Sequence, residues 1–138
     1  MGTMAAWAPH ERGLAEQVLR GQTVVASVTS SRSKQTYLDL LAWADDRGLY
    51  VYVGRRMPPH WTGGNPYVRG PFDWANPYKL GRDGDRTTII ERFEHLYLPG
   101  HPDLIDRLPE LDGKVLGCWC APEHCHGDVL ARLCHARH

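Results

Sequence analysis

KVLGCWCAPEHCHGDVLARL, residues 114–133, joins an apolar run, a cysteine-rich turn and an amphipathic segment, and this succession indicates the class of fold. Residues 114–120 are predicted to form a strand because short apolar runs are typical of buried strands. Residues 121–127 form a tight connection, and residues 128–138 are predicted to form a helix. In open α/β sheets, where strands lead through short loops into helices, ligands bind beyond the carboxyl ends of the strands.

Two more strands and a helix are predicted near the beginning of the chain. Residues 23–28 (TVVASV) and 49–54 (LYVYVG) are rich in β-branched and aromatic residues, as buried strands are. A polar turn at Thr29–Ser33, with good helix N-caps, leads into residues 34–48. That segment carries apolar side chains at helical spacing: Tyr37, Leu40, Leu41 and Ala44. A strand, a helix and a strand in about thirty residues predict parallel strands with a right-handed crossover.

The other segments complete the prediction of one domain, residues 1–138. Residues 1–20 are expected to be an N-terminal helical extension, with Leu14, Val18 and Leu19 on its buried face. Residues 55–84, rich in proline, glycine and aromatic residues, are expected to form an ordered loop packed over the sheet. Residues 114–135 carry the Cys/His motif.

A further helix is predicted to begin at Asp85, a good N-cap, and to carry one apolar stripe. The stripe contains Ile89, Ile90, Phe93, Leu96 and Tyr97. We therefore expect a single α/β domain with a mostly parallel sheet of three to five strands, flanking helices and Rossmann-like layering.

The composition excludes some classes of protein and favours others. With 16 basic and 16 acidic residues the formal net charge is zero, so bulk charge does not indicate binding to nucleic acid or membrane. No apolar run approaches the roughly 20 residues of a membrane span, and the first residues lack the order of a secretory signal. We expect a cytoplasmic protein, in which clustered thiols favour metal or redox chemistry over disulfides.

Three hypotheses explain the cysteine-rich turn. Cys118, Cys120, Cys125 and His126 could hold zinc, or three of the thiolates an iron–sulfur cluster, although the spacing is unusual for either. Cys120 or Cys125 could instead be a catalytic thiol with His126 as its proton partner. The cysteines could also be buried residues without chemistry, as Cys134 is expected to be.

The position of the turn leads to two more expectations. A helix N-terminus favours thiolate over thiol, which predicts lowered pKa values for Cys125 and Cys120, with Asp128 as the helix cap. Strand alternation predicts that Cys118 and Cys120 share one face and that Trp119 points to the other.

A second set of polar residues follows the strand at 49–54. Arg55, Arg69 and Arg82 could bind phosphate or carboxylate, and Asn76, held by the proline after it, could orient a substrate. Trp61, Trp74 and Tyr78 could stack on a base or sugar. The alternative is structural, since arginines near glycine are often solvated and loop aromatics usually pack the loop down.

The order VYVGRR, WANPYKLGRDG and LPELDGKVLGCWCAPEHCHGDVLARL resembles a family of uncharacterised bacterial and phage proteins, domain of unknown function 4326, over roughly residues 50–134. The recurring positions of that family fall on Arg55, Asn76, Pro77, Gly81, Cys118, Trp119, Cys120, Pro122, Cys125, His126, Gly127 and Asp128. The chain departs from it at Ala75, where glycine is commoner, and by a longer proline-rich loop. A weaker similarity to the unknown-function family 488 implies an α/β sheet with the arginine and the Cys-His loop at one edge.

These observations favour a small enzyme that acts on a phosphate-bearing or nucleotide-like ligand. The catalytic residues would be Cys120, Cys125 and His126, and the substrate-binding residues would be Arg55, Asn76, Arg82 and Asp128. Two alternatives stay open: a zinc or iron–sulfur module without catalysis, and a nucleic-acid or protein adaptor.

Overall fold

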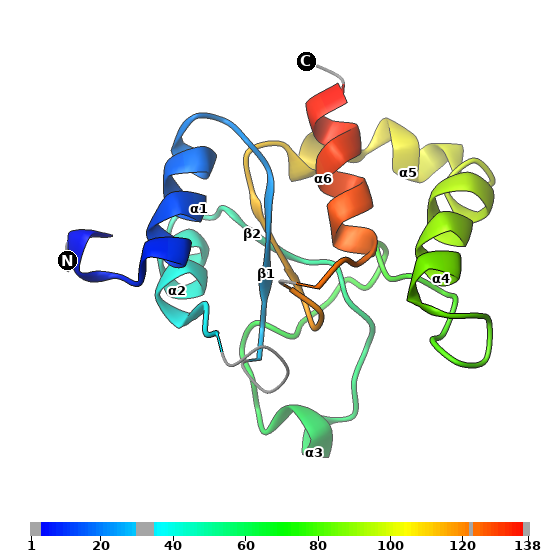
Figure 1. The fold of residues 1–138 in the computed structure, drawn as a ribbon, viewed down its shortest axis with the longest axis horizontal. Helices are drawn as coiled ribbons and strands as arrows, with labels where there is room; N and C mark the ends of the chain where they lie inside the picture. Colours follow the sequence, from blue (N-terminus) through cyan, green and yellow to red (C-terminus); the bar gives the residue numbers. More distant parts are fainter. Residues whose placement is uncertain (1–3, 30–34, 122, 137–138) are drawn as a thin grey trace.

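The computed structural model describes residues 4–29, 35–121 and 123–136 and places helices on both sides of a small sheet (Figure 1). Within these residues the sheet has three strands in the order β1-β3-β2, namely β1 (Val24–Ser27), β3 (Val115–Cys118) and β2 (Tyr50–Tyr52). Both outer strands run parallel to β3. The prediction of an α/β fold with a parallel sheet is confirmed, and the arrangement is compatible with Rossmann-like layering.

The central strand β3 is buried along its whole length. Val24 of β1 and Tyr50 of β2 both lie opposite Val115. Burial on both faces explains why this strand reads as a continuous apolar run. At Gly117 the Tyr50 ring lies so close that a Cβ atom would overlap with it. The hydroxyl of Tyr50 donates a hydrogen bond to the carbonyl of Tyr67 and so holds the ring in place. Glycine is therefore needed here for close approach.

Helices α1 (Pro9–Leu19) and α2 (Leu38–Asp46) pack against each other on one side of the sheet (Figure 1). The carboxylate of Glu11 is only 2% exposed and accepts the backbone N–H groups of Asp39 and Leu40, at 3.2 and 3.4 Å. It therefore caps α2 from the neighbouring helix, because the first N–H groups of a helix have no partner within it.

The predicted apolar face of the second helix is confirmed, because all four of its members are buried: Tyr37, Leu40, Leu41 and Ala44. The prediction that Leu19 is buried is wrong. Leu19 is 61% exposed because α1 ends there, and Ala15 and Val18 fill the inner face instead. Most of the polar turn predicted at Thr29–Ser33 lies outside the described residues.

Helix α4 (Arg86–Arg92) begins as predicted, since the side chain of Asp85 accepts the N–H of Thr88. It continues into a π-helical turn, η2 (Phe93–Tyr97), in which the N–H of Leu98 bonds to the carbonyl of Phe93. This wider turn rotates the following side chains. Leu96, predicted in the apolar stripe, is 60% exposed, whereas Leu98 is buried.

The remaining helical elements are η1 (Met4–Ala6), α3 (Pro59–Thr62), α5 (Pro102–Asp106), η3 (Leu108–Leu111) and α6 (His126–Ala136). Helix α6 starts two residues earlier than expected and packs on β1 and β3. Cys134 is buried on it, which confirms that residue as part of the core. In the described part of the chain, no helix has the length and apolar character that crossing a membrane requires.

The contact between Gly117 and Tyr50 predicts a large effect from one methyl group. Gly117→Ala should lower the free energy of unfolding by roughly 1–3 kcal/mol, because the added methyl overpacks the centre of the sheet. Gly13→Ala is the matched control: its Cβ would meet nothing within 4 Å, and alanine favours a helix interior. Urea unfolding of both variants checks this, and equal stability of Gly117→Ala and the wild type would contradict it.

Candidate functional site

A cavity of about 400 Å³ lies where β2 and β3 end, next to α4 and the start of α6. Six of the residues predicted for the site line it: Arg55, Asn76, Cys118, Cys120, Cys125 and His126. Arg55 and the thiols are more than sixty residues apart in the chain, but they meet because the carboxyl ends of parallel strands lie at the same edge of the sheet.

The ring of His126 connects the thiol-bearing turn to the end of β2. Its Nε2 lies 2.7 Å from the carbonyl oxygen of Val53, and because a carbonyl only accepts, Nε2 carries the hydrogen. The Phe93 ring packs edge-on against it, with centroids 5.0 Å apart. Burial lowers the pKa of His126, and the nearby Arg55 lowers it further. With Nε2 committed to Val53, the ring is placed to hold the fold together rather than to take a proton from a thiol.

The thiol of Cys125 interacts with those of both Cys118 and Cys120. The Cys125 thiol donates to the sulfur of Cys118 at 3.4 Å, and both residues are almost fully buried, whereas Cys120 is half-buried. Interaction with the Cys125 thiol, together with burial, raises the pKa of Cys120. Contact with Cys118 and burial raise that of Cys125. The prediction of lowered thiol pKa values is therefore wrong, because these tertiary contacts outweigh the helix N-terminus.

Asp128 stabilises the turn and does not line the cavity. Its carboxylate accepts the backbone N–H of Cys125 at 2.9 Å and lies 3.2 Å from Nδ1 of His124. A carboxylate in the first turn that reaches back to the residue before the helix is half of a capping box. The predicted role as helix cap is confirmed in this modified form, and binding of substrate by Asp128 is not supported by its position.

The side chains of Arg55 and Asn76 are largely used to hold the long loop. Arg55 donates from Nε to the carbonyl of Asn76 at 3.4 Å and from Nη2 to that of Tyr78 at 2.9 Å. The Asn76 amide donates to the carbonyl of Ile89 and accepts the N–H of Tyr78. Asn76 therefore positions the cavity wall, while Arg55 brings its charge to the cavity without an acidic partner among these contacts.

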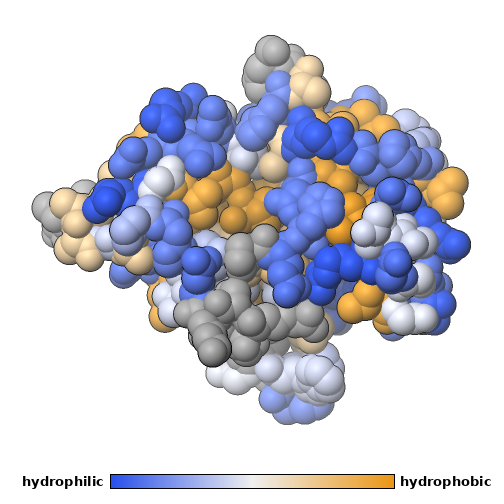
Figure 2. Space-filling view, viewed as in Figure 1, coloured by the Kyte–Doolittle hydropathy of each residue, from blue (hydrophilic) through white to orange (hydrophobic). Residues whose placement is uncertain are grey.

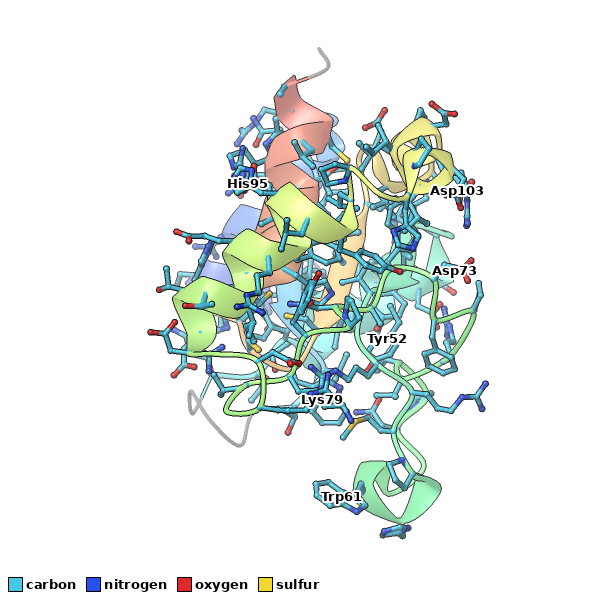
Figure 3. All side chains as sticks on the ribbon, turned by 90° about the vertical axis from the view of Figure 1, so that its right-hand side faces the viewer. Tyr52, Trp61, Asp73, Lys79, His95 and Asp103 are labelled. Atoms are coloured by element: carbon cyan, nitrogen blue, oxygen red, sulfur yellow. The ribbon has the colours of Figure 1, made fainter. Side chains whose placement is uncertain are left out.

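Two other predicted residues lie away from the cavity. Arg82 pairs with Asp83 on the surface at 2.6 Å and also donates to the carbonyl of Pro77. Trp61 is 67% exposed and projects from α3, away from Tyr52 and Lys79 (Figure 3). Arg82, predicted to bind substrate, does not line the cavity, and its ion pair with Asp83 holds it at the loop surface. Arg69, Trp74 and Tyr78 do not line the cavity either.

Lys79 and Arg86 line the cavity and were not predicted. Arg86 pairs with Glu123 at 3.0 Å and donates to the carbonyl of His124 at 3.3 Å. Its interaction with the Cys120 thiol, and to a smaller extent the charge of Glu123, raises its pKa. The sequence offered one signal that Arg86 belongs to the site: it directly follows the helix cap Asp85, and helices that begin near the ends of parallel strands border the ligand site.

Trp119 also lines the cavity, contrary to the alternation expected of a strand. Alternation fails because β3 ends at Cys118, so the backbone beyond it is no longer extended in the sheet. The Trp119 indole donates to the hydroxyl of Tyr52 at 2.7 Å, and that hydroxyl donates to the carbonyl of Arg55 at 2.6 Å. These two bonds connect the ends of β3 and β2.

The proposed metal ligands do not form a metal site in the part of the chain that the structure describes. There, no group of three His, Cys, Asp or Glu side chains is arranged to hold a metal ion. His126 explains part of this, since its Nε2 is bonded to Val53. A second, shallower cavity of about 310 Å³ lies between α1 and α6 beside β1, in the region of the apolar patch in Figure 2, and contains no thiol.

The lowered pKa of His126 predicts a specific loss of stability in acid. Below its ordinary pKa of 6.5 the unfolded chain takes up a proton that the folded ring resists, so the free energy of unfolding falls as the pH drops through and below 6.5. His126→Gln keeps a donor for Val53 but cannot titrate. Its stability should fall less steeply than the wild type between pH 7 and 5 in urea titrations; identical slopes would contradict the assignment.

Comparisons with known proteins agree with the resemblance seen in the motifs. An uncharacterized protein of Acanthamoeba polyphaga mimivirus is 31% identical over 91 residues, 60% of this chain and 65% of the relative. An uncharacterized 12.4 kDa protein in the nrdA-td intergenic region of Enterobacteria phage T4 is 37% identical over 76 residues, 47% of this chain and 61% of the relative. The chain thus spans slightly under two thirds of the length of each of these two relatives.

No solved structure matches the chain. Residues 43–136, more than half of the sequence, match the family described as Domain of unknown function (DUF4326). The protein belongs to the DUF4326 family.

Proposed function

We propose that the protein is a small enzyme that binds a phosphate-bearing, nucleotide-like ligand in the strand-end cavity. Arg55, Lys79 and Arg86 would bind the anionic group, and the thiol of Cys120 would be the reacting group. The observation that carries this proposal is the meeting of three cationic side chains and an accessible thiol in one cavity that no described Asp or Glu side chain lines.

The charges of the cavity favour an anion. Arg55 donates only to backbone carbonyls in its described contacts, so its charge is not neutralised there. Lys79 adds a second charge, and Arg86 a third that Glu123 offsets in part. Because the protein as a whole is neutral, this local excess is a property of the cavity rather than of the composition.

The rest of the wall favours an apolar, planar group beside the anion. Its apolar members are Met57, Leu80, Ile89, Ile90 and Trp119. A volume of about 400 Å³ lies within the usual range for small-molecule sites. A ligand with a base or similar ring and a phosphate fits both parts of the cavity: its ring would pack on the apolar wall, and its phosphate would bind the cationic side chains.

Cys120 is the candidate reacting group because it is half-buried, whereas the other two members of the thiol cluster are almost fully buried. Its raised pKa means that it is protonated in the ligand-free protein at neutral pH, so a step that uses it as nucleophile must first remove that proton. None of the four cysteines, all of which the structure describes, forms a disulfide, which fits the reducing cytoplasm that we propose as the location of the protein.

Binding of a nucleoside monophosphate tests the proposal, with the parent nucleoside and inorganic phosphate as partial ligands. By isothermal titration calorimetry, Arg86→Gln should weaken binding of the monophosphate roughly ten- to hundredfold, because it removes a charge-assisted contact to phosphate. Arg82→Gln is the matched control, since Arg82 lies in the loop just before α4 but outside the cavity.

Two outcomes would overturn the proposal. One is equal weakening by the two arginine variants, which would indicate general surface charge. The other is no binding of the monophosphate together with steeply salt-dependent binding of a single-stranded oligonucleotide, which would favour a nucleic-acid adaptor.

A further inference from the structure

The three thiols differ in their exposure to the cavity, and this difference suggests the order in which they would react. All three cysteines line the cavity, but Cys120 is only half-buried, whereas Cys125 and Cys118 are 3% and 1% exposed. Cys125 contacts both of the others: its thiol donates to Cys118 at 3.4 Å and it interacts with the thiol of Cys120. The cluster is therefore a row of sulfurs along the cavity wall, with Cys125 in the middle and Cys120 as the most exposed member.

We propose that this row is a thiol–disulfide exchange site, in which Cys120 reacts with a small-molecule disulfide and Cys118–Cys125 becomes the final protein disulfide. The inference concerns the same cavity as the proposed function, but it does not require a phosphate-bearing ligand. It assigns an activity to the two buried thiols, which the proposed function leaves unused.

The exchange proceeds in three balanced steps. Cys120, after loss of its proton, attacks one sulfur of the external disulfide, giving a mixed disulfide and releasing one small thiolate that takes up the proton. The Cys125 sulfur, after loss of its proton, then attacks the Cys120 sulfur and releases the second small thiol. Cys118 attacks the Cys125 sulfur and returns Cys120 to the thiol. In total, two protein thiols are oxidised by two electrons and one external disulfide is reduced to two thiols.

Access and contact determine this order. An external disulfide can reach Cys120 from the cavity, while Cys125 and Cys118 border the cavity but are almost fully buried, so their sulfurs are less accessible to it. The Arg86 guanidinium interacts with the Cys120 thiol and partly offsets the rise in its pKa that Cys125 and burial cause. Transfer onward needs only small movements, because Cys125 already touches Cys118. Cys134 lies apart, with its thiol 3.7 Å from the carbonyl of Leu108, and is left out of the exchange.

Oxidised glutathione is the probe, added to the reduced folded protein, followed by acid quenching and peptide mapping by mass spectrometry. The wild type should form the Cys118–Cys125 disulfide. Cys118→Ser should stop at Cys120–Cys125, and Cys125→Ser should accumulate only glutathione on Cys120. Cys120→Ser should slow disulfide formation on the order of tenfold or more, because the accessible entry thiol is lost. Cys134→Ser, the matched control, should react like the wild type.

The same mapping shows how the proposal would fail. Formation of the Cys118–Cys125 disulfide at an unchanged rate in Cys120→Ser would remove the entry role. A wild-type protein that stays fully reduced while its urea-unfolded form is oxidised would remove the whole proposal. Circular dichroism establishes that each variant is folded. Binding of the nucleoside monophosphate is measured separately, so failure of the thiol exchange and failure of the proposed function are distinguishable.

Discussion

The hydrogen bond between Nε2 of His126 and the carbonyl of Val53 is the constraint on which the site depends. It ties the first residue of α6 to the residue that follows β2, and the Phe93 ring holds the imidazole from the side of η2. Two residues beyond Val53 is Arg55, and one residue before His126 is Cys125. Together with the bond from the Trp119 indole to the Tyr52 hydroxyl, it connects the cationic end of β2 to the thiol-bearing turn.

Much of the fold could be predicted because it follows from periodic patterns. The buried face of α2 and the three strands are local features, and their parallel order brings Arg55 and the cysteines to one edge of the sheet. Leu96 was misplaced because the π-helical turn breaks the periodicity that the stripe relied on. Nothing in the spacing of residues marks such a turn in advance.

The site was less predictable, because its chemistry depends on tertiary contacts. Lys79 reaches the cavity through the path of a loop that has no periodic signal, and Arg86 reaches it from the first residue of α4. Arg82 instead forms an ion pair with Asp83 at the loop surface. The pKa values of Cys120 and Cys125 are raised, whereas the prediction was that they are lowered. The contacts among the thiols and their burial cause this rise, and neither can be recognised from the spacing of the cysteines in the sequence. The position of the thiols at a helix N-terminus, taken alone, predicted the wrong direction of the pKa shift.

The cavity combines two features that rarely serve structure alone. Unneutralised cationic groups beside an apolar wall fit an anion with a flat apolar part, and a graded row of thiols fits chemistry that starts at the exposed sulfur. The membership of the protein in a family of unknown function leaves both open to direct measurement. Cys120 and Arg86 are where the two features meet.

The most direct measurement of the central claim is the rate at which iodoacetamide alkylates Cys120, with and without a saturating nucleoside monophosphate, followed by mass spectrometry. If the ligand and the thiol share one cavity, the bound nucleotide should slow alkylation by about tenfold or more, because it covers the sulfur. An unchanged rate at a nucleotide concentration that calorimetry shows to be saturating would contradict the account.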